Sequence, residues 1–220
     1  MTKAQLLAQA RLDLGDTESP YLWSDAELTS YIEEAEREAA ERADLLETEE
    51  DATYCTVTLA EDTSVYALNA LVYDVLKARV SGENNYLDRT TRDKLDRDNP
   101  TWEDDSGIPQ KYYLTNGGRT MRVTPTPTAA GTLSLVVLRL PVNPMGTSPE
   151  IHARHHFRML DWAYNLAYKK RDADTYSPTE SLKHEKLFEQ SFGRRWDATQ
   201  QKIRLKKTPT TMRDTLDQDL

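Results

Sequence analysis

The chain has 220 residues and a mass of 25.2 kDa, enough for one large domain or two small ones with a buried core. Hydrophobic residues make up 38% and charged residues 30%, and the longest apolar run, Leu133 to Leu138, is far too short to span a membrane. The single cysteine, Cys55, excludes an intramolecular disulfide and a multi-cysteine metal site, so we expect folding in a reducing compartment without secretion or a membrane anchor.

Helical periodicity predicts two helices at the N-terminal end. The first covers about residues 6–14 and ends at Gly15. The second begins after Ser24, because Glu27 follows three residues later and completes a capping box. It continues to about Leu46 with an alanine-rich face, so another helix can approach it closely.

In the middle of the chain, apolar and polar residues alternate with a period of two, which is typical of β-strands. Residues 71–80 fit a strand or a helix, and the preceding turn and the β-branched residues favour a strand. Asn116-Gly117-Gly118 predicts a hairpin, since a primed turn needs positive φ at its centre. We expect about four to six antiparallel strands here. The predicted strands are residues 54–59, 65–68, 71–80, 111–114, 120–124 and 133–140, and a short helix is predicted over residues 92–96.

The last third of the chain is predicted to be helical again. One helix starts at Ser148-Pro149-Glu150 and runs to about Arg171, with proline at its first position. Another starts at Ser177-Pro178 and runs to about Leu205. Its apolar stripe is Phe188, Phe192, Trp196, Thr199 and Ile203. From Lys206 onward the composition is polar, which predicts a flexible arm that orders on a partner.

These elements predict an α+β protein. The N- and C-terminal helices form a helical bundle, the middle forms a central antiparallel β unit, and an extended C-terminal arm follows. The predicted boundaries are residues 1–51 for the N-terminal helices, 52–147 for the β-rich insertion, 148–205 for the C-terminal helices that complete the bundle, and 206–220 for the arm.

Charge is segregated along the chain. Residues 1–51 hold 4 basic and 15 acidic residues, a net charge of −11, whereas residues 150–207 hold 13 and 8, a net charge of +5. One interpretation is that these are solvated helix faces. The other is head-to-tail association, in which the acidic face of one subunit meets the basic face of its neighbour. The overall charge of −9 argues against a protein that coats DNA.

No motif for phosphate binding, dinucleotide binding, nucleophilic catalysis or zinc-protease chemistry is present, and no cofactor is expected. The strongest candidate for a metal site is the cluster of His152, His155 and His156, in which the first and last are one helical turn apart. A metal-dependent enzyme using this cluster is one alternative. The other interpretation is that the imidazoles are exposed or satisfy polar groups at a helix-sheet junction, so that no metal is bound. Cys55 is expected to behave as a small buried or half-buried apolar residue.

The order of these features resembles the head-to-tail adaptor proteins of tailed bacteriophages, also called connector or head completion proteins. The resemblance covers about residues 3 to 205. The sequence patterns that carry it are Pro20-Tyr21-Leu22-Trp23-Ser24-Asp25-x-Glu27-Leu28, Glu34-Ala35-x-x-Glu38-Ala39-x-x-Arg42-Ala43, Gly107-Ile108-Pro109-x-x-Tyr112, Pro125-x-Pro127, Arg139-Leu140-Pro141, Pro149-Glu150-Ile151, Tyr164 and Arg171-Asp172-x-Asp174.

The resemblance implies a non-enzymatic virion protein of the phage neck. Such proteins form an oligomeric ring, commonly twelve-fold, that joins the portal protein to tail or nozzle proteins and extends the channel through which viral DNA passes without sequence-specific binding. Assembly would take place in the host cytoplasm, with no membrane involved. A neck or tail protein that stacks on a different ring is the nearest alternative.

Two groups of residues are predicted to make the contacts. The arm is the expected portal-binding segment, through Lys206, Lys207, Met212, Leu216 and Leu220. Glutamates expected to project from the second helix would line the channel or face a neighbouring subunit, because an acidic wall repels phosphates. These residues are Glu33, Glu34, Glu41 and Glu47.

Overall fold

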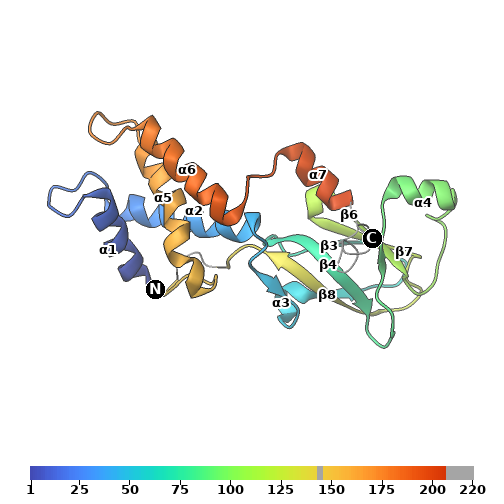
Figure 1. Cartoon of the computed structure of the whole chain (residues 1–220). Coiled ribbons are helices and arrows are strands. Elements are labelled where there is room, and N and C mark those ends of the chain that lie inside the picture. The colour runs from blue at the N-terminus through green and yellow to red at the C-terminus, as the bar shows by residue number, and fades with distance from the viewer. Residues whose placement is uncertain (143–145, 207–220) are drawn as a thin grey trace, which may run out of the picture. The chain divides into compact units, whose positions relative to one another are not determined.

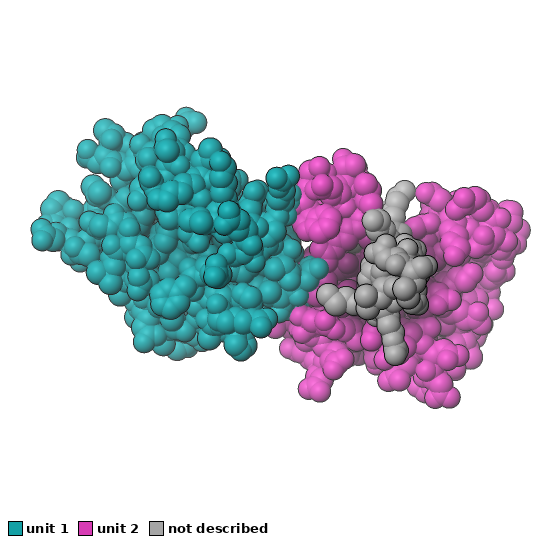
Figure 2. All heavy atoms as spheres, viewed as in Figure 1, with its two compact units in different colours: residues 1–46, 140–195 teal, residues 47–139, 196–220 magenta. Residues whose placement is uncertain are grey.

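A computed structural model describes residues 1–142 and 146–206 of the chain (Figure 1). The chain divides into two compact units, drawn in different colours in Figure 2. Unit 1 consists of residues 1–46 and 140–195, and unit 2 of residues 47–139 together with the segment from Trp196 onward. The first is helical and the second is built mainly from β-strands, so the predicted α+β class is confirmed.

Unit 1 is a bundle of four main helices arranged around α5. They are α1 (Lys3–Leu14), α2 (Asp25–Arg42), α5 (His156–Lys169) and α6 (Pro178–Phe192). Helix α5 packs against each of the other three, which explains why apolar residues cover most of its circumference. The core is completed by small residues of α2, since Ala35, Ala39 and Ala40 are fully buried and allow α5 to approach closely.

The ends of these helices follow local signals in the sequence. Gly15 ends α1 in the left-handed conformation at φ 68°. The predicted capping box of Ser24 and Glu27 is present at the start of α2, and Ser177 caps α6 as predicted. A second capping box, between Thr2 and Gln5, begins α1 and was not predicted.

Unit 2 contains two four-stranded sheets. In the first, the nine-residue strand β8 (Gly131–Arg139) pairs on one side with β4 (Val72–Val80) and on the other with β1 (Glu47–Thr48) and β2 (Thr56–Leu59). The second has the order β3 (Val65–Ala67), β7 (Thr120–Thr124), β6 (Lys111–Thr115) and β5 (Asp88–Arg89). Residues 71–80 are therefore a strand, as the preceding turn favoured.

The hairpin predicted at Asn116-Gly117-Gly118 connects β6 to β7. Its turn is a short 3₁₀ segment, η1 (Asn116–Gly118), in which Asn116 has φ 52° and Gly117 has φ 67°. The expectation of positive φ at this turn is confirmed. The predicted short helix is also present as α4 (Arg92–Asp98), ended by Asn99.

The β region has more strands than predicted. The described residues contain eight strands, and two of them, β1 and β5, are only two residues long. Strand β5 pairs with β6 in parallel, so the β unit is not purely antiparallel. Segments this short have no period of their own to detect and are defined only by their partners.

Several predicted elements were wrong in their boundaries. Helix α2 ends at Arg42 rather than near Leu46, and its predicted last turn is followed by strand β1. Tyr54 and Cys55 belong to a short helix, α3 (Ala52–Cys55), because Asp51 caps it by accepting the amide of Thr53 at 2.9 Å.

The helix predicted from Ser148 begins only at His156, after a short 3₁₀ turn, η2 (Ala153–His155). The backbone amide of Glu150 donates to the carboxylate of Glu36 at 2.6 Å, which holds this segment outside the helix. Tertiary contact with α2 thus overrides the local signal of Pro149 at a first helical position.

The last predicted helix is two helices. Gly193, with φ 86°, ends α6, and α7 (Ala198–Lys206) begins after Asp197, whose carboxylate accepts the amides of Thr199 at 2.8 Å and Gln200 at 2.7 Å. The predicted continuous stripe is therefore interrupted. Phe188 and Phe192 are buried in unit 1, whereas the remaining three members lie beyond Gly193 in unit 2.

Candidate interaction surfaces

The predicted acidic residues do not lie on one helix. Glu33, Glu34 and Glu41 are half-buried residues of α2 in unit 1. Glu47 is exposed, but it belongs to strand β1 of unit 2, where it pairs with Leu138. The expectation that all four glutamates project from one helix was wrong, because α2 ends at Arg42.

Glu33 and Glu34 share an open hollow of about 340 Å³ on unit 1. Its apolar part is formed by the half-buried side chains of Tyr31, on α2, and Leu166, on α5. Ser30 and Arg37 complete the lining. Glu33 also lies 3.8 Å from the ammonium group of Lys3, in an exposed ion pair that contributes little to stability.

Two other glutamates of α2 are structural, which the sequence analysis missed. Glu36 is fully buried and accepts the backbone amides of Glu150 at 2.6 Å and Ile151 at 3.5 Å. Glu38 is 4% exposed and forms ion pairs with Arg42 at 2.8 Å and Arg195 at 3.0 Å. Their positions on the alanine-rich side of α2 are the sequence signal that could have separated them from the exposed glutamates.

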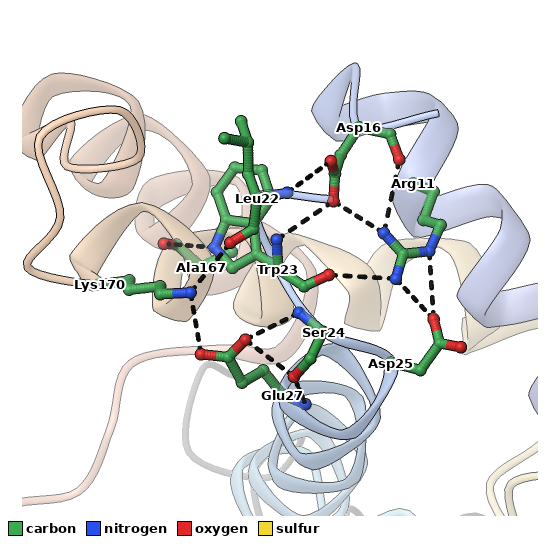
Figure 3. Close-up of polar contacts among 9 residues, drawn as sticks. All are labelled: Arg11, Asp16, Leu22, Trp23, Ser24, Asp25, Glu27, Ala167 and Lys170. Atoms are coloured by element: carbon green, nitrogen blue, oxygen red, sulfur yellow. Dashed lines mark hydrogen bonds and ion pairs between the residues drawn. The ribbon is translucent and has the colours of Figure 1, made fainter. Parts of the chain in front are cut away.

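The resemblance motif at residues 20–28 forms a polar network, drawn in Figure 3. Asp16 accepts the amides of Leu22 at 2.8 Å and Trp23 at 3.3 Å, and it pairs with Arg11 at 2.7 Å. The indole of Trp23, which is 2% exposed, donates to the carbonyl of Ala167 at 3.1 Å. The motif thus connects the loop after α1 to α5 and explains why a buried tryptophan stands next to a capping serine.

Glu27 and Lys170 complete this network. The carboxylate of Glu27 accepts from the backbone amide of Ser24 at 2.8 Å and lies 3.0 Å from the ammonium group of Lys170. These two contacts lower the pKa of Glu27 to about 2. The hydrogen bond from the amide of Ser24 has the largest effect, and the contact with Lys170 has the next largest. Both contacts favour the charged carboxylate, so this junction is strongest when Glu27 is ionised.

The three clustered histidines have different partners. His156 is buried, with Nδ1 2.7 Å from the amino group of Met1 and Nε2 3.0 Å from the carbonyl oxygen of Ile151. His152 accepts the amide of Arg154 at 3.2 Å, and His155 lies 2.9 Å from the guanidinium of that arginine. Burial lowers the pKa of both His155 and His156. The imidazoles therefore satisfy nearby polar groups rather than converge on one point.

Residues 1–142 and 146–206 contain no group of three or more histidine, cysteine, aspartate or glutamate side chains placed to hold a metal ion. Nor, over the same residues, is any helix both long and apolar enough for a membrane span. Cys55 is buried, with Sγ 3.2 Å from the carbonyl oxygen of Thr48, and burial raises the pKa of its thiol.

Only the beginning of the predicted arm falls within the described residues. Lys206 is the last residue of α7, and this helix packs against β6 and η1 within unit 2. The other predicted arm contacts, Lys207, Met212, Leu216 and Leu220, lie outside the described residues.

Comparison with known proteins gives one family. The model of the family described as SU10 adaptor protein matches residues 1–213, which is nearly the whole chain. A search of curated proteins found no match. The family match covers both compact units and extends beyond the region of about residues 3 to 205 on which the sequence patterns rest.

Proposed function

The chain belongs to the SU10 adaptor protein family of phages, and we propose that it forms a ring that joins the portal to the tail and extends the DNA channel. The observation that carries the proposal is the family match over residues 1–213. The ring would be twelve-fold, as the resemblance implies, and would lie in the neck of the virion after assembly in the host cytoplasm.

Charge segregation supports assembly through unlike surfaces. The acidic N-terminal and basic C-terminal regions contribute most of their residues to the same unit, since unit 1 holds residues 1–46 and 140–195. A contact between different patches of neighbouring copies forms a closed ring when the rotation that relates one copy to the next is a whole-number fraction of a full turn. Opposite charges would favour such a contact and weaken it as salt is added.

The negative charge of the chain suits a channel that does not bind DNA. At a net charge of −9, the protein repels phosphate groups, so viral DNA would pass without sequence-specific contacts. We assign the accessible glutamates of the predicted set to surfaces that face a neighbouring subunit or the channel. These residues are Glu33, Glu34, Glu41 and Glu47.

The C-terminal arm, residues 206–220, is the proposed portal contact. Met212, Leu216 and Leu220 are spaced four residues apart, so a helix formed on a partner would place them on one face. Lys206 and Lys207 precede them and would pair with acidic groups of the portal. The segment has few other apolar residues, which favours a contact that folds only on binding.

Cryo-electron microscopy of the neck of intact virions tests the proposal. The expected result is a ring of this chain in contact with the portal on one side and with tail or nozzle proteins on the other. A ring that stacks on another ring without touching the portal would replace the portal assignment by a neck or tail role. Virions in which the chain is absent from the neck would overturn the proposal.

A further inference from the structure

Helix α6 presents an apolar and basic stripe to solvent. Leu182 is 53% exposed and Leu187 is 38% exposed, although both are large apolar residues. They lie on the side of α6 away from Phe188 and Phe192, which are buried against α5. The stripe, which we call the α6 stripe, consists of Pro178, Thr179, Leu182, Lys183, Lys186 and Leu187.

The hollow on α2 has complementary properties. It is an open hollow whose lining combines the apolar side chains of Tyr31 and Leu166 with the carboxylates of Glu33 and Glu34. We call it the α2 hollow; its six lining residues are Ser30, Tyr31, Glu33, Glu34, Arg37 and Leu166. The exposed leucines of the α6 stripe can pack between side chains of α2 as ridges pack into grooves between helices inside proteins.

The two surfaces also carry opposite charges at similar spacing along their helices. The α6 stripe carries Lys183 and Lys186, and Glu180 precedes them at the same three-residue spacing. In the α2 hollow, Arg37 follows Glu34 by three residues. At 1.5 Å per residue, each three-residue step is about 4.5 Å along its helix. Antiparallel docking would therefore place opposite charges together at two successive steps.

The pairs formed by this docking can be stated individually. Arg37 would meet Glu180 and Glu34 would meet Lys183. The next step would place Lys186 opposite Tyr31, from where its long side chain would reach Glu33. Lys183 already lies 2.8 Å from Glu180 within its own helix, in an exposed pair. That pair can be shared or exchanged at little cost, because exposed ion pairs contribute about 0–1 kcal/mol.

The two surfaces belong to different faces of unit 1. Helix α5 packs against both α2 and α6, and the α6 stripe points away from α5. Building on the proposed ring, we propose that the α6 stripe of one copy docks into the α2 hollow of the next copy and forms the contact that repeats around the ring. The occupant of each surface is thus a second copy of this chain.

Charge reversal tests this contact in full-length protein. The first variant carries Lys183→Glu and Lys186→Glu, and the second carries Glu33→Lys and Glu34→Lys. Each variant alone should lose self-association by about tenfold or more, because like charges would face each other across the contact. The control is Lys94→Glu with Arg97→Glu, two exposed residues of α4 that give the same change of net charge as the first variant. It should associate like the wild type.

Mixing the two variants provides the decisive measurement. In the mixture, the acidic α6 stripe of the first variant can dock into the basic α2 hollow of the second. The unchanged basic α6 stripe of the second variant can dock into the unchanged acidic α2 hollow of the first. An equimolar mixture should therefore recover the assembly seen by analytical ultracentrifugation and electron microscopy. A single chain carrying all four substitutions should assemble with itself and not with the wild type.

The outcomes separate this inference from the proposed function. If the wild type forms rings and both charge-reversal variants form them equally well, the docking contact is wrong but the proposed ring is supported. Variants that lose association but are not rescued by mixing would also overturn the docking contact. A wild-type chain that stays monomeric at every concentration would overturn the docking between copies. The role in the neck is tested independently, by microscopy of virions. Circular dichroism of each variant verifies that unit 1 remains folded.

Discussion

Arg11 and Asp16 form a buried ion pair across the end of helix α1. Their side chains are 11% and 2% exposed, and Nη1 of the arginine lies 2.7 Å from Oδ2 of the aspartate. Gly15 turns the chain between them, and Asp16 then accepts the amides of the loop that leads to Trp23 (Figure 3). This ion pair is therefore one of the contacts of Arg11 that hold the connection from α1 to α2, together with those to Trp23 and Asp25.

Arg11→Met should destabilise unit 1 by about 3–5 kcal/mol. The substitution keeps an aliphatic side chain but removes the guanidinium, so the carboxylate of Asp16 is left buried without its cation. Urea denaturation followed by tryptophan fluorescence measures the change, since Trp23 and Trp162 both lie in this unit. Arg92→Ala, which removes an exposed ion pair with Glu103, is the control and should change stability by less than about 1 kcal/mol. Equal effects of the two variants would contradict the prediction.

Replacement of Glu36 should be far more destabilising than replacement of Glu34. Glu36→Ala removes a fully buried acceptor of the amide of Glu150 and leaves that donor unsatisfied, at a cost of about 1–3 kcal/mol before the cavity is included. Glu34→Ala removes a half-buried residue from the rim of a hollow, so monomer stability should barely change. Thermal unfolding of dilute protein compares them, and similar melting temperatures would show that Glu36 has no structural role.

Acid should weaken unit 1 partly through Glu27. The pKa of Glu27 in the folded protein is about 2, below its ordinary value of 4.5, so ionisation stabilises the fold. This contribution is complete above about pH 4.5 and is lost as the pH falls toward 2. The difference in denaturation midpoint between wild type and Glu27→Gln should therefore be constant near neutral pH and shrink in acid. A difference that stays the same down to about pH 2 would contradict the prediction.

Gly117→Ala should destabilise unit 2 by about 1–2 kcal/mol. Gly117 has φ 67°, a conformation in which a Cβ atom is strained even though nothing lies within 4 Å of it. Gly131→Ala is the matched control, because Gly131 has no positive φ and its added Cβ would make only an ordinary contact, 3.9 Å from Leu59. If both variants melt at the same temperature, the positive φ of Gly117 does not contribute to the stability of unit 2.

Deletion of residues 207–220 should leave both units folded and abolish portal attachment. The last described helix, α7, ends at Lys206, so the deletion leaves every described element intact. Melting temperature and co-sedimentation with portal rings should be compared for the full-length and truncated chains. A full-length triple variant, Met212→Ser with Leu216→Ser and Leu220→Ser, should lose binding as well if the apolar residues carry the contact. Unchanged co-sedimentation of both would move the portal contact elsewhere.

The signals that the sequence analysis interpreted correctly are local. Ser24 and Glu27 are three residues apart, and Asn116 and Gly117 are adjacent, so the geometry they impose depends little on the rest of the chain. The break between α6 and α7 also has a local signal in the sequence. Gly193 and Asp197 are a helix terminator and a cap in the expected order.

The features that were missed depend on contacts between distant residues. The start of α5 is delayed because Glu36 takes the amide of Glu150, 114 residues away in the chain. Strand β1 exists only because Glu47 and Thr48 pair with β8. The α2 hollow also depends on a distant contact, since Leu166 of α5 completes a lining whose other residues all belong to α2.

The chain passes three times between the two units, at residues 46–47, 139–140 and 195–196. On the ribosome, α1 and α2 emerge first, but α5 and α6, which cover their apolar faces, are synthesised only after the whole sheet-forming segment has been made. The two helices must therefore wait with Ile32 and Ala39 unprotected while about 90 residues of the other unit are translated. A chaperone that shields nascent apolar helices would consequently raise the yield of native protein more than it would for a chain whose units were sequential.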